Sequence, residues 1–280
     1  DLPYNQFVLQ QIAGDLLDKQ AEPIATGFFV VGPTYQSDGG DPEAKAAAQA
    51  ETLSDRIDTF SRAFLGLTAA CARCHDHKFD PITIEDYYAL AGIFNNTRNT
   101  NRQVGSQVDI DAYQAAQKAI SDQNNSINSY LESESKRLKI NRKEIEKNLP
   151  EESKKQLAGM RSKLEELKKQ LPPKPGTAHV LSDSGNSDIH VAIRGDLRRK
   201  GEKVPRRFLE IIAGKEAVPY TEGSGRLQLA KSVTAPDNPL TARVIVNRIW
   251  GWHFGEALVR TPSNFGVIGE APSHPGLLDW

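Results

Sequence analysis

The sequence predicts a mainly α-helical protein with minor β structure, in which a charged helical hairpin separates two other regions. Over most of the first hundred residues, apolar side chains recur every three or four positions. Residues 111–171 change to a seven-residue apolar repeat in a background of Lys, Glu, Gln and Ser, and short runs of β-branched residues follow. We therefore divide the chain into residues 1–110, residues 111–171, and a second α-rich domain over residues 172–280.

Three helices are expected in the first region. The apolar spacing predicts helices over residues 3–17, 44–70 and 84–94. Thr83 stands where an N-cap of the third helix would lie, because its hydroxyl can accept a hydrogen bond from a backbone N–H of the first turn. The second helix leads directly into the segment CARCHDHKFDP, residues 71–81.

The charged middle region is expected to form an antiparallel hairpin of two helices, over residues 111–149 and 151–171, joined around residues 148–150. Charged positions are interpreted as a solvated helical face, through which the protein could also form oligomers. The apolar positions form a coiled-coil seam of Tyr113, Ile120, Ile127, Leu131, Leu138, Ile145, Leu157, Met160, Leu164, Leu167 and Leu171.

The third region mixes strands and helices. Alternating β-branched residues predict short strands over residues 178–182 and 189–194. Helical patterns then stand on both sides of a turn at residues 236–239, where Asp237 or Asn238 can begin the turn.

Composition excludes several classes of protein. A net charge of −1 and a pI of about 6.7 give no overall attraction to nucleic acid. No apolar run approaches the length of a membrane span; residues 28–32 (FFVVG) are only strand length. Two cysteines are too few for a disulfide scaffold. Both ends of the chain have the character of cuts through a longer protein.

The two cysteines belong to the pattern C-x-x-C-H, typical of covalent haem attachment. Cys71 and Cys74 can form thioethers to the two vinyl groups on one porphyrin edge, and His75 can then bind the iron as its proximal ligand. Three alternatives stay open at this point. These are a thioredoxin-like redox pair, a zinc site using Cys71, Cys74 and His77, and a structural disulfide or buried free thiols.

Several residues can be considered as the second axial ligand of such a haem. Met160 lies on the hairpin seam, where packing explains it, and His77 is too close to His75 to reach the opposite face of the same iron. We expect His77 to bond a propionate or a neighbouring carboxylate. The distal candidates are His190 and His274, with His179, His253 or an open position as further options.

Other side chains near the motif suit secondary roles. Arg73 and Lys78 are candidate partners for haem propionates, as are Arg98 and Arg102, because cationic side chains bind carboxylates well. Residues 250–254 (WGWHF) form an aromatic group that we interpret as core packing. The tripeptide at residues 194–196 (RGD) is interpreted as a structural Arg–Asp pair beside a strand end.

Long stretches resemble a known family. Residues 58–94 (DTFSRAFLGLTAACARCHDHKFDPITIEDYYALAGIF) resemble the central motif of the planctomycete cytochrome-c-like domain family, whose function is unknown, and residues 1–17 are similar to its upstream pattern. Residues 238–280 resemble the partner domain that usually follows it. The matching positions in that second domain are Asn247, Arg248, Trp250, Gly266, His274 and Pro275.

The resemblance implies an exported protein, periplasmic or extracellular, with a c-type-cytochrome-like helical region. It assigns Cys71 and Cys74 to haem attachment and His75 to iron ligation, and implies a redox partner protein or a further haem domain. We expect electron transfer through one haem c. The alternatives are a haem enzyme with an open iron site, such as a peroxidase or an oxidase acting on a polymer, and a surface-assembly protein with a structural haem or zinc.

Overall fold

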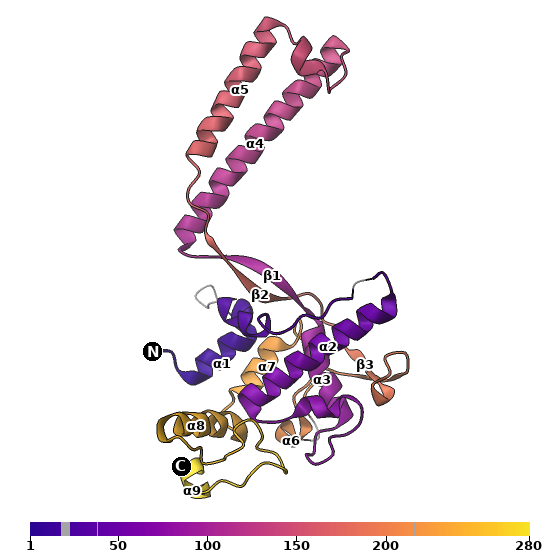
Figure 1. Ribbon diagram of the computed structural model, residues 1–280, viewed down its shortest axis with the longest axis vertical. Helices are drawn as coiled ribbons and strands as arrows, with labels where there is room; N and C mark the ends of the chain where they lie inside the picture. The colour runs from indigo at the N-terminus through magenta and orange to yellow at the C-terminus, as the bar shows by residue number, and fades with distance from the viewer. Residues whose placement is uncertain (18–22, 38, 215–216) are drawn as a thin grey trace. The chain divides into compact units, whose positions relative to one another are not determined.

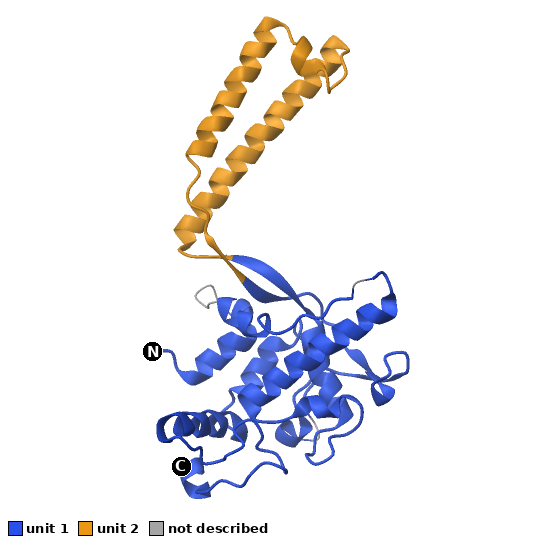
Figure 2. Cartoon of the chain, viewed as in Figure 1, with its two compact units in different colours: residues 1–102, 179–280 blue, residues 103–178 orange. Residues whose placement is uncertain are grey.

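The computed structural model describes residues 1–17, 23–37, 39–214 and 217–280. Helices predominate and the strands form two small sheets, which confirms a mainly α fold with minor β (Figure 1). The chain divides into two compact units, residues 1–102 with 179–280, and residues 103–178 (Figure 2). None of the helices in these described ranges combines the length and the apolar character that a membrane span requires.

Helices build most of the first unit. In chain order they are α1 (Tyr4–Ala13), α2 (Pro42–Phe60), α3 (Ile84–Asn95), α6 (Glu210–Ala213), α7 (Arg226–Val233), α8 (Pro239–Phe254) and α9 (Pro275–Asp279). One hydrophobic core takes Ile12 from α1, Phe60 from α2, Phe94 from α3 and Leu229 from α7. The buried Leu278 of α9 belongs to a separate small cluster with Leu258 and Val259.

The predicted start of α3 is confirmed by its cap, and α8 also begins with a capping side chain. Thr83 Oγ1 accepts a hydrogen bond from the Asp86 backbone N–H, and the Asp86 carboxylate accepts one from the Thr83 N–H. This reciprocal pair fixes the start of α3. The Asn238 side chain accepts a hydrogen bond from Leu240 N, which begins α8 after the predicted turn.

Two predicted helices end earlier than the apolar pattern suggested. α1 ends at Ala13 and continues as a 3-10 helix over Gly14–Leu16. α2 ends at Phe60, continues as a π-helical turn (Ser61–Leu65), and stops at Gly66, whose φ of 63° is left-handed. The apolar spacing continues to Ala70 because the chain stays in contact with the core after the helix has ended.

Within the described residues, the strands form two sheets, each made of two strands that are consecutive in the strand numbering. β1 (Thr97–Val104) pairs with β2 (Gly176–Asp183), and β3 (Ile189–Ala192) pairs antiparallel with β4 (Lys200–Val204). The two predicted strands correspond to β2 and β3, although β3 ends at Ala192 rather than residue 194. Their partners were not predicted, because β1 and β4 are mostly polar and exposed and carry no alternating apolar signal.

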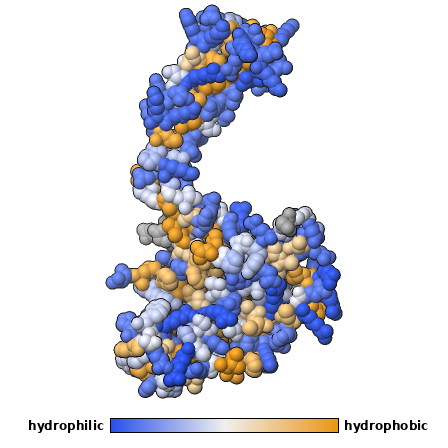
Figure 3. Space-filling view, in the orientation of Figure 1, coloured by the Kyte–Doolittle hydropathy of each residue, from blue (hydrophilic) through white to orange (hydrophobic). Residues whose placement is uncertain are grey.

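The second unit is a helical hairpin of α4 (Gln107–Leu138) and α5 (Glu151–Lys169). The predicted first helix, to residue 149, is wrong at its end: Lys139, with φ 55°, terminates α4, and a short 3-10 helix (Ile145–Asn148) follows. The apolar repeat predicted too long a helix because Ile145 and Leu149 belong to the hydrophobic cluster of the hairpin, although neither is part of α4. Met160 packs against this cluster as expected, and the outer surface of the hairpin is mostly hydrophilic (Figure 3).

Candidate functional site

The C-x-x-C-H segment lies on a short 3-10 helix, Ala69–Arg73, rather than at the end of α2. Ala69 and Ala72 are fully buried and fix this helix to the core. Cys71 and Cys74 lie between and beside them, and both are exposed free thiols. The local fold therefore anchors the backbone while presenting the thiols to solvent.

His75 is exposed, and its Nδ1 lies 2.6 Å from the backbone carbonyl oxygen of Asp76. A carbonyl oxygen only accepts hydrogen bonds, so Nδ1 must carry the proton. Nε2 then holds the free lone pair and faces no hydrogen-bond partner among the described residues. This is the tautomer in which histidine binds a metal ion, with the other ring nitrogen oriented by a carbonyl oxygen.

His77, by contrast, is buried and uses both ring nitrogens within the protein. The backbone N–H groups of Phe79 and Asp80 donate to Nδ1 at 3.2 and 2.8 Å, so the proton is on Nε2, which lies 3.0 Å from Thr68 Oγ1. The predicted bond to a neighbouring carboxylate is wrong, because Asp80 Oδ2 lies 3.7 Å from Nδ1 and that nitrogen is an acceptor. A zinc site using His77 would have to break these bonds.

Asp80 connects the motif to the C-terminal part of the first unit. Its Oδ1 accepts a 2.7 Å hydrogen bond from Val267 N, and the carboxylate leaves no room for a Cβ at Gly266. Asp80 Oδ2 is buried and has no hydrogen-bond partner among the described residues. Asp76 accepts a 2.9 Å bond from Ile84 N at the start of α3. The second half of the motif thus fixes neighbouring segments in place.

A groove lies beside the exposed half of the motif. One cavity of about 410 Å³ is lined by Arg73, Tyr88, His190 and Lys200, among others. A second cavity of about 630 Å³ shares Arg73 and includes Gly195. Gly195 lies so close to Cys74 that a Cβ there would be 2.6 Å from its Sγ. Of the motif, Arg73 lines both cavities together with residues of the turn after β3, whereas Cys71, Cys74 and His75 line neither.

The predicted propionate partners separate in the structure. Arg73 lines the groove and forms a 2.8 Å ion pair with Glu51. Burial opposes the charge of Arg73, but the hydrogen bond to Glu51 and nearby groups raise its pKa above the usual value. Lys78 does not line the groove: its Nζ lies 5.1 Å from the centre of the Phe79 ring.

The two distal histidine candidates also separate. His190 lines the groove, and its Nδ1 lies 3.0 Å from the Gly201 carbonyl oxygen, which leaves Nε2 with the lone pair. His274 lies just before α9, where its Nδ1 is 3.1 Å from Ser273 Oγ, and it does not line the groove. The structure therefore brings only His190 of this pair to the side of Arg73.

Two further interpretations can be compared with the structure. Asp196 of the RGD tripeptide pairs with Arg198 at 3.1 Å rather than with Arg194, although the pair does follow a strand end. The expected core packing of the aromatic group is wrong for Trp252 and Phe254, which are 73% and 68% exposed. Trp250 packs against the small cluster around Leu258.

Sequence reasoning missed the tyrosines of the groove. Tyr87 and Tyr88 lie side by side on α3 with ring centroids 5.1 Å apart. Burial raises the pKa of Tyr87 to about 12. The pair of adjacent tyrosines in a helix that otherwise faces the core was the available signal. Within the described ranges, no group of three or more His, Cys, Asp or Glu side chains has the geometry of a metal site.

Comparison with known proteins identifies two domain families of unknown function. Residues 1–99 match the family model PSCyt2, described as a protein of unknown function (DUF1549). Residues 225–280 match PSD1, described as a protein of unknown function (DUF1553). The two matches occur in the expected order, and both describe domains of unknown function, so the cytochrome-like character of the first segment stays a prediction. No curated protein and no solved structure matches the chain.

The two matched segments are bonded to each other within the first unit. Arg248 donates at 2.6 Å to the carbonyl oxygens of Ala63 and Arg62, and Phe265 N donates at 2.7 Å to Gly66 O. With the bond from Val267 to Asp80, these contacts hold the segment before the cysteine motif and the segment after it.

Proposed function

We propose that this protein is an exported c-type cytochrome that carries one haem c and transfers electrons. Cys71 and Cys74 would attach the haem, and His75 would bind its iron. The observation that carries the proposal is the combination of two exposed free thiols with a neighbouring histidine whose Nε2 lone pair is unused. The donor set fits the group, because thioether attachment needs accessible thiols and iron ligation needs this tautomer.

Attachment requires no oxidant from the protein. The thiols of Cys71 and Cys74 would each add across one vinyl double bond, so that a carbon–sulfur bond would form and the thiol proton would go to the other vinyl carbon. Bound in this way, the haem iron supplies a one-electron redox couple. The protein would contribute the positive charges of Arg73 and Lys200 on the groove, which suit haem propionates. Lys78 could join them only by leaving the Phe79 ring.

We favour His190 over His274 as the second axial ligand. His190 shares the groove with Arg73, and its Nδ1 is held by a backbone carbonyl oxygen in the same way as that of His75. Two histidine ligands would give a lower reduction potential than a His–Met pair. An open iron position, and with it a peroxidase or oxidase, remains the alternative function; a surface-assembly role through the hairpin is the other.

Export follows from the chemistry of attachment and from the resemblance. The redox partner would then be another periplasmic or extracellular protein, or a further haem domain of the same polypeptide. Both expectations require that the protein carries the haem.

The test is production of the full chain in a bacterial host that attaches haem c in its periplasm. We expect intact-protein mass spectrometry to show one added haem and the absorption spectrum to show a Soret band. Cys71→Ala with Cys74→Ala should abolish the added mass. Unmodified cysteines in the exported, folded protein would contradict the proposal.

The axial ligand is tested separately with His190→Ala and a matched His274→Ala variant. We expect His190→Ala to retain the covalent haem but to shift its spectrum from low-spin to high-spin, whereas His274→Ala leaves the spectrum unchanged. The reverse result assigns His274. No shift in either variant contradicts both while leaving the haem proposal intact.

A further inference from the structure

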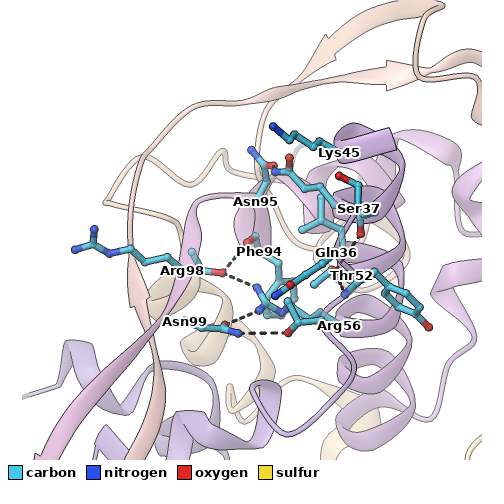
Figure 4. Close-up of a pocket in the computed structure, with 15 residues that line it drawn as sticks. Gln36, Ser37, Lys45, Thr52, Arg56, Phe94, Asn95, Arg98 and Asn99 are labelled. Carbon is cyan, nitrogen blue, oxygen red and sulfur yellow. Dashed lines mark hydrogen bonds between the residues drawn. The ribbon is translucent and has the colours of Figure 1, made fainter. Parts of the chain in front are cut away.

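A polar pocket lies on a face of α2 adjacent to the one that lines the groove. It has a volume of about 600 Å³ and is formed by residues 34–37, the start and middle of α2, the end of α3 and the start of β1 (Figure 4). Its lining is rich in amides and hydroxyls, including Gln36, Gln49, Asn95 and Ser37. Such groups suit a polar ligand rather than an apolar one.

Arg56 is the unusual residue of this pocket. It is only 6% exposed, and its guanidinium donates to Thr97 Oγ1 at 3.0 Å and to Asn99 Oδ1 at 2.8 Å. Both partners are neutral, and Arg56 forms no ion pair with any carboxylate of the described residues. A buried charge without an opposite charge is costly.

Arg226 shows how the same protein treats another buried arginine. Its guanidinium is fully buried and pairs with Asp15 at 2.8 Å and Asp183 at 2.6 Å. Arg56 has no equivalent pairs. Burial, together with the positive charge of Arg226, lowers the pKa of Arg56, with Asp55 opposing this shift. Arg56 therefore lacks the negative charge that would stabilise it.

The other charged residues that line the pocket are also positive. Lys45 stands near Ser37 at the edge of the pocket, whereas the Arg98 guanidinium points away from the other labelled residues (Figure 4). Among the described residues that line the pocket, none is acidic. The pocket thus combines two cations with amide and hydroxyl donors, which is the chemistry that recognises oxyanions.

We propose that this pocket binds a small polar organic molecule through its carboxylate, sulfate or phosphate group. Arg56 and Lys45 bind the oxyanion, and the amides of Gln36, Gln49 and Asn95 bind the remaining polar groups. The volume exceeds that needed by an inorganic anion and lies in the range of small-molecule sites, about 300–1,000 Å³. The ligand therefore carries its anionic group on a larger polar body.

The pocket adjoins the groove beside the cysteine motif. Gln49, Leu53 and Asn95 line both. A 2.6 Å hydrogen bond from Gln49 Nε2 to Asn95 Oδ1 crosses this boundary. A ligand in the pocket would lie next to the proposed haem groove, although binding of the anion does not depend on the haem.

The test is calorimetric titration of the full chain with four probes: glucuronate, glucose 6-sulfate, glucose 6-phosphate and neutral glucose. Inorganic phosphate and sulfate are titrated separately. We expect at least one sugar anion to bind, and to bind more tightly than glucose and the inorganic ions. Preference among the three sugar anions identifies the anionic group.

Variants decide whether binding occurs in this pocket. Lys45→Gln should weaken binding about fivefold and Arg56→Gln about tenfold or more, because each removes a charge-assisted hydrogen bond. Lys231→Gln, at an exposed site on α7, is the matched control and should change nothing. Should Arg56→Gln fail to fold, Lys45→Glu replaces it and should abolish binding through repulsion.

Several results would overturn the proposal. These are no binding of any sugar anion at millimolar concentration, equal or tighter binding of the inorganic ions, or affinities unchanged by Lys45→Gln and Lys45→Glu. Asp38 lies outside the described residues and follows Ser37 in the sequence, so Asp38→Asn is included. Binding seen only in that variant would mean that a carboxylate of the protein already takes this place, and would also overturn the proposal.

Discussion

The two halves of the segment 71–81 differ in what the fold requires of them. In residues 71–75, the thiols and the His75 ring are exposed, and only the alanine and the backbone serve the core. In residues 76–81, His77 and Asp80 are buried and bond to Thr68 and Val267. One continuous motif therefore contains a part available for chemistry and a part needed for folding.

The two halves of the motif differ in how strongly they indicate a cofactor. Packing and hydrogen bonding explain His77 and Asp80 without any cofactor, so they are poor evidence for one. They leave the two cysteines and His75 unexplained, because exposed residues without partners contribute little to stability. Only the two cysteines and His75 therefore point to a cofactor.

The largest expected effect comes from breaking the buried half. His77→Ala should lower the free energy of unfolding by about 3 kcal/mol, since it leaves Thr68, the buried N–H of Asp80 and the part-buried N–H of Phe79 without partners. Asp80→Ala should cost a similar amount, whereas Asp80→Asn should cost about 1 kcal/mol or less, because Oδ1 still accepts from Val267 N. Urea unfolding measures these differences. Equal losses for Asn and Ala at residue 80 would show that the carboxylate charge itself is needed.

The pH dependence of Tyr87 comes next. Its pKa is about 12 in the folded protein against 10.0 for the unperturbed group, because burial disfavours the phenolate. The folded state holds this proton more tightly, so stability is fully present below pH 10 and is lost as the pH rises toward 12. The loss should reach about 2 kcal/mol. Urea unfolding at pH 9 and pH 11 should show a smaller drop in Tyr87→Phe than in the unaltered protein. An identical drop would mean that Tyr87 is not titrating in this window.

The contact between Gly195 and Cys74 joins the exposed half to the groove. Gly195→Ala should cost about 1–2 kcal/mol, because φ is 77° and the new Cβ would collide with Cys74 Sγ. Cys74→Ala removes the sulfur, so the double variant should recover part of this loss. Cys71→Ala is the matched control and should give no recovery. Thermal unfolding of the four variants measures the coupling.

The smallest effect is expected for the exposed half itself. In protein produced without haem attachment, Cys71→Ser, Cys74→Ser and His75→Ala should each change stability by about 0.5 kcal/mol or less. Urea unfolding checks this against His77→Ala as the reference. A loss comparable to that of His77→Ala would remove the distinction between the two halves, and with it the main argument that residues 71–75 serve a cofactor.

The sequence supported the local features of the fold well. Apolar spacing located the longer helices, and the side chain of Thr83 marked the start of α3 because capping is a local interaction. It failed where long-range packing competes with local pattern. Gly66 ends the π-helical turn that follows α2, where the chain approaches Phe265 and Val244 closely, and neither neighbour is visible from the sequence around Gly66.

The same division holds for the sites. The type and spacing of the thiols and of His75 are read directly from the sequence, because the proposed attachment and ligation would depend on neighbouring positions in one segment. Only the tertiary structure decided that His77 is buried, that His190 shares the groove with Arg73, and that Arg56 is enclosed without a counter-charge. Burial and pairing depend on residues far apart in the chain, and no local pattern encodes them.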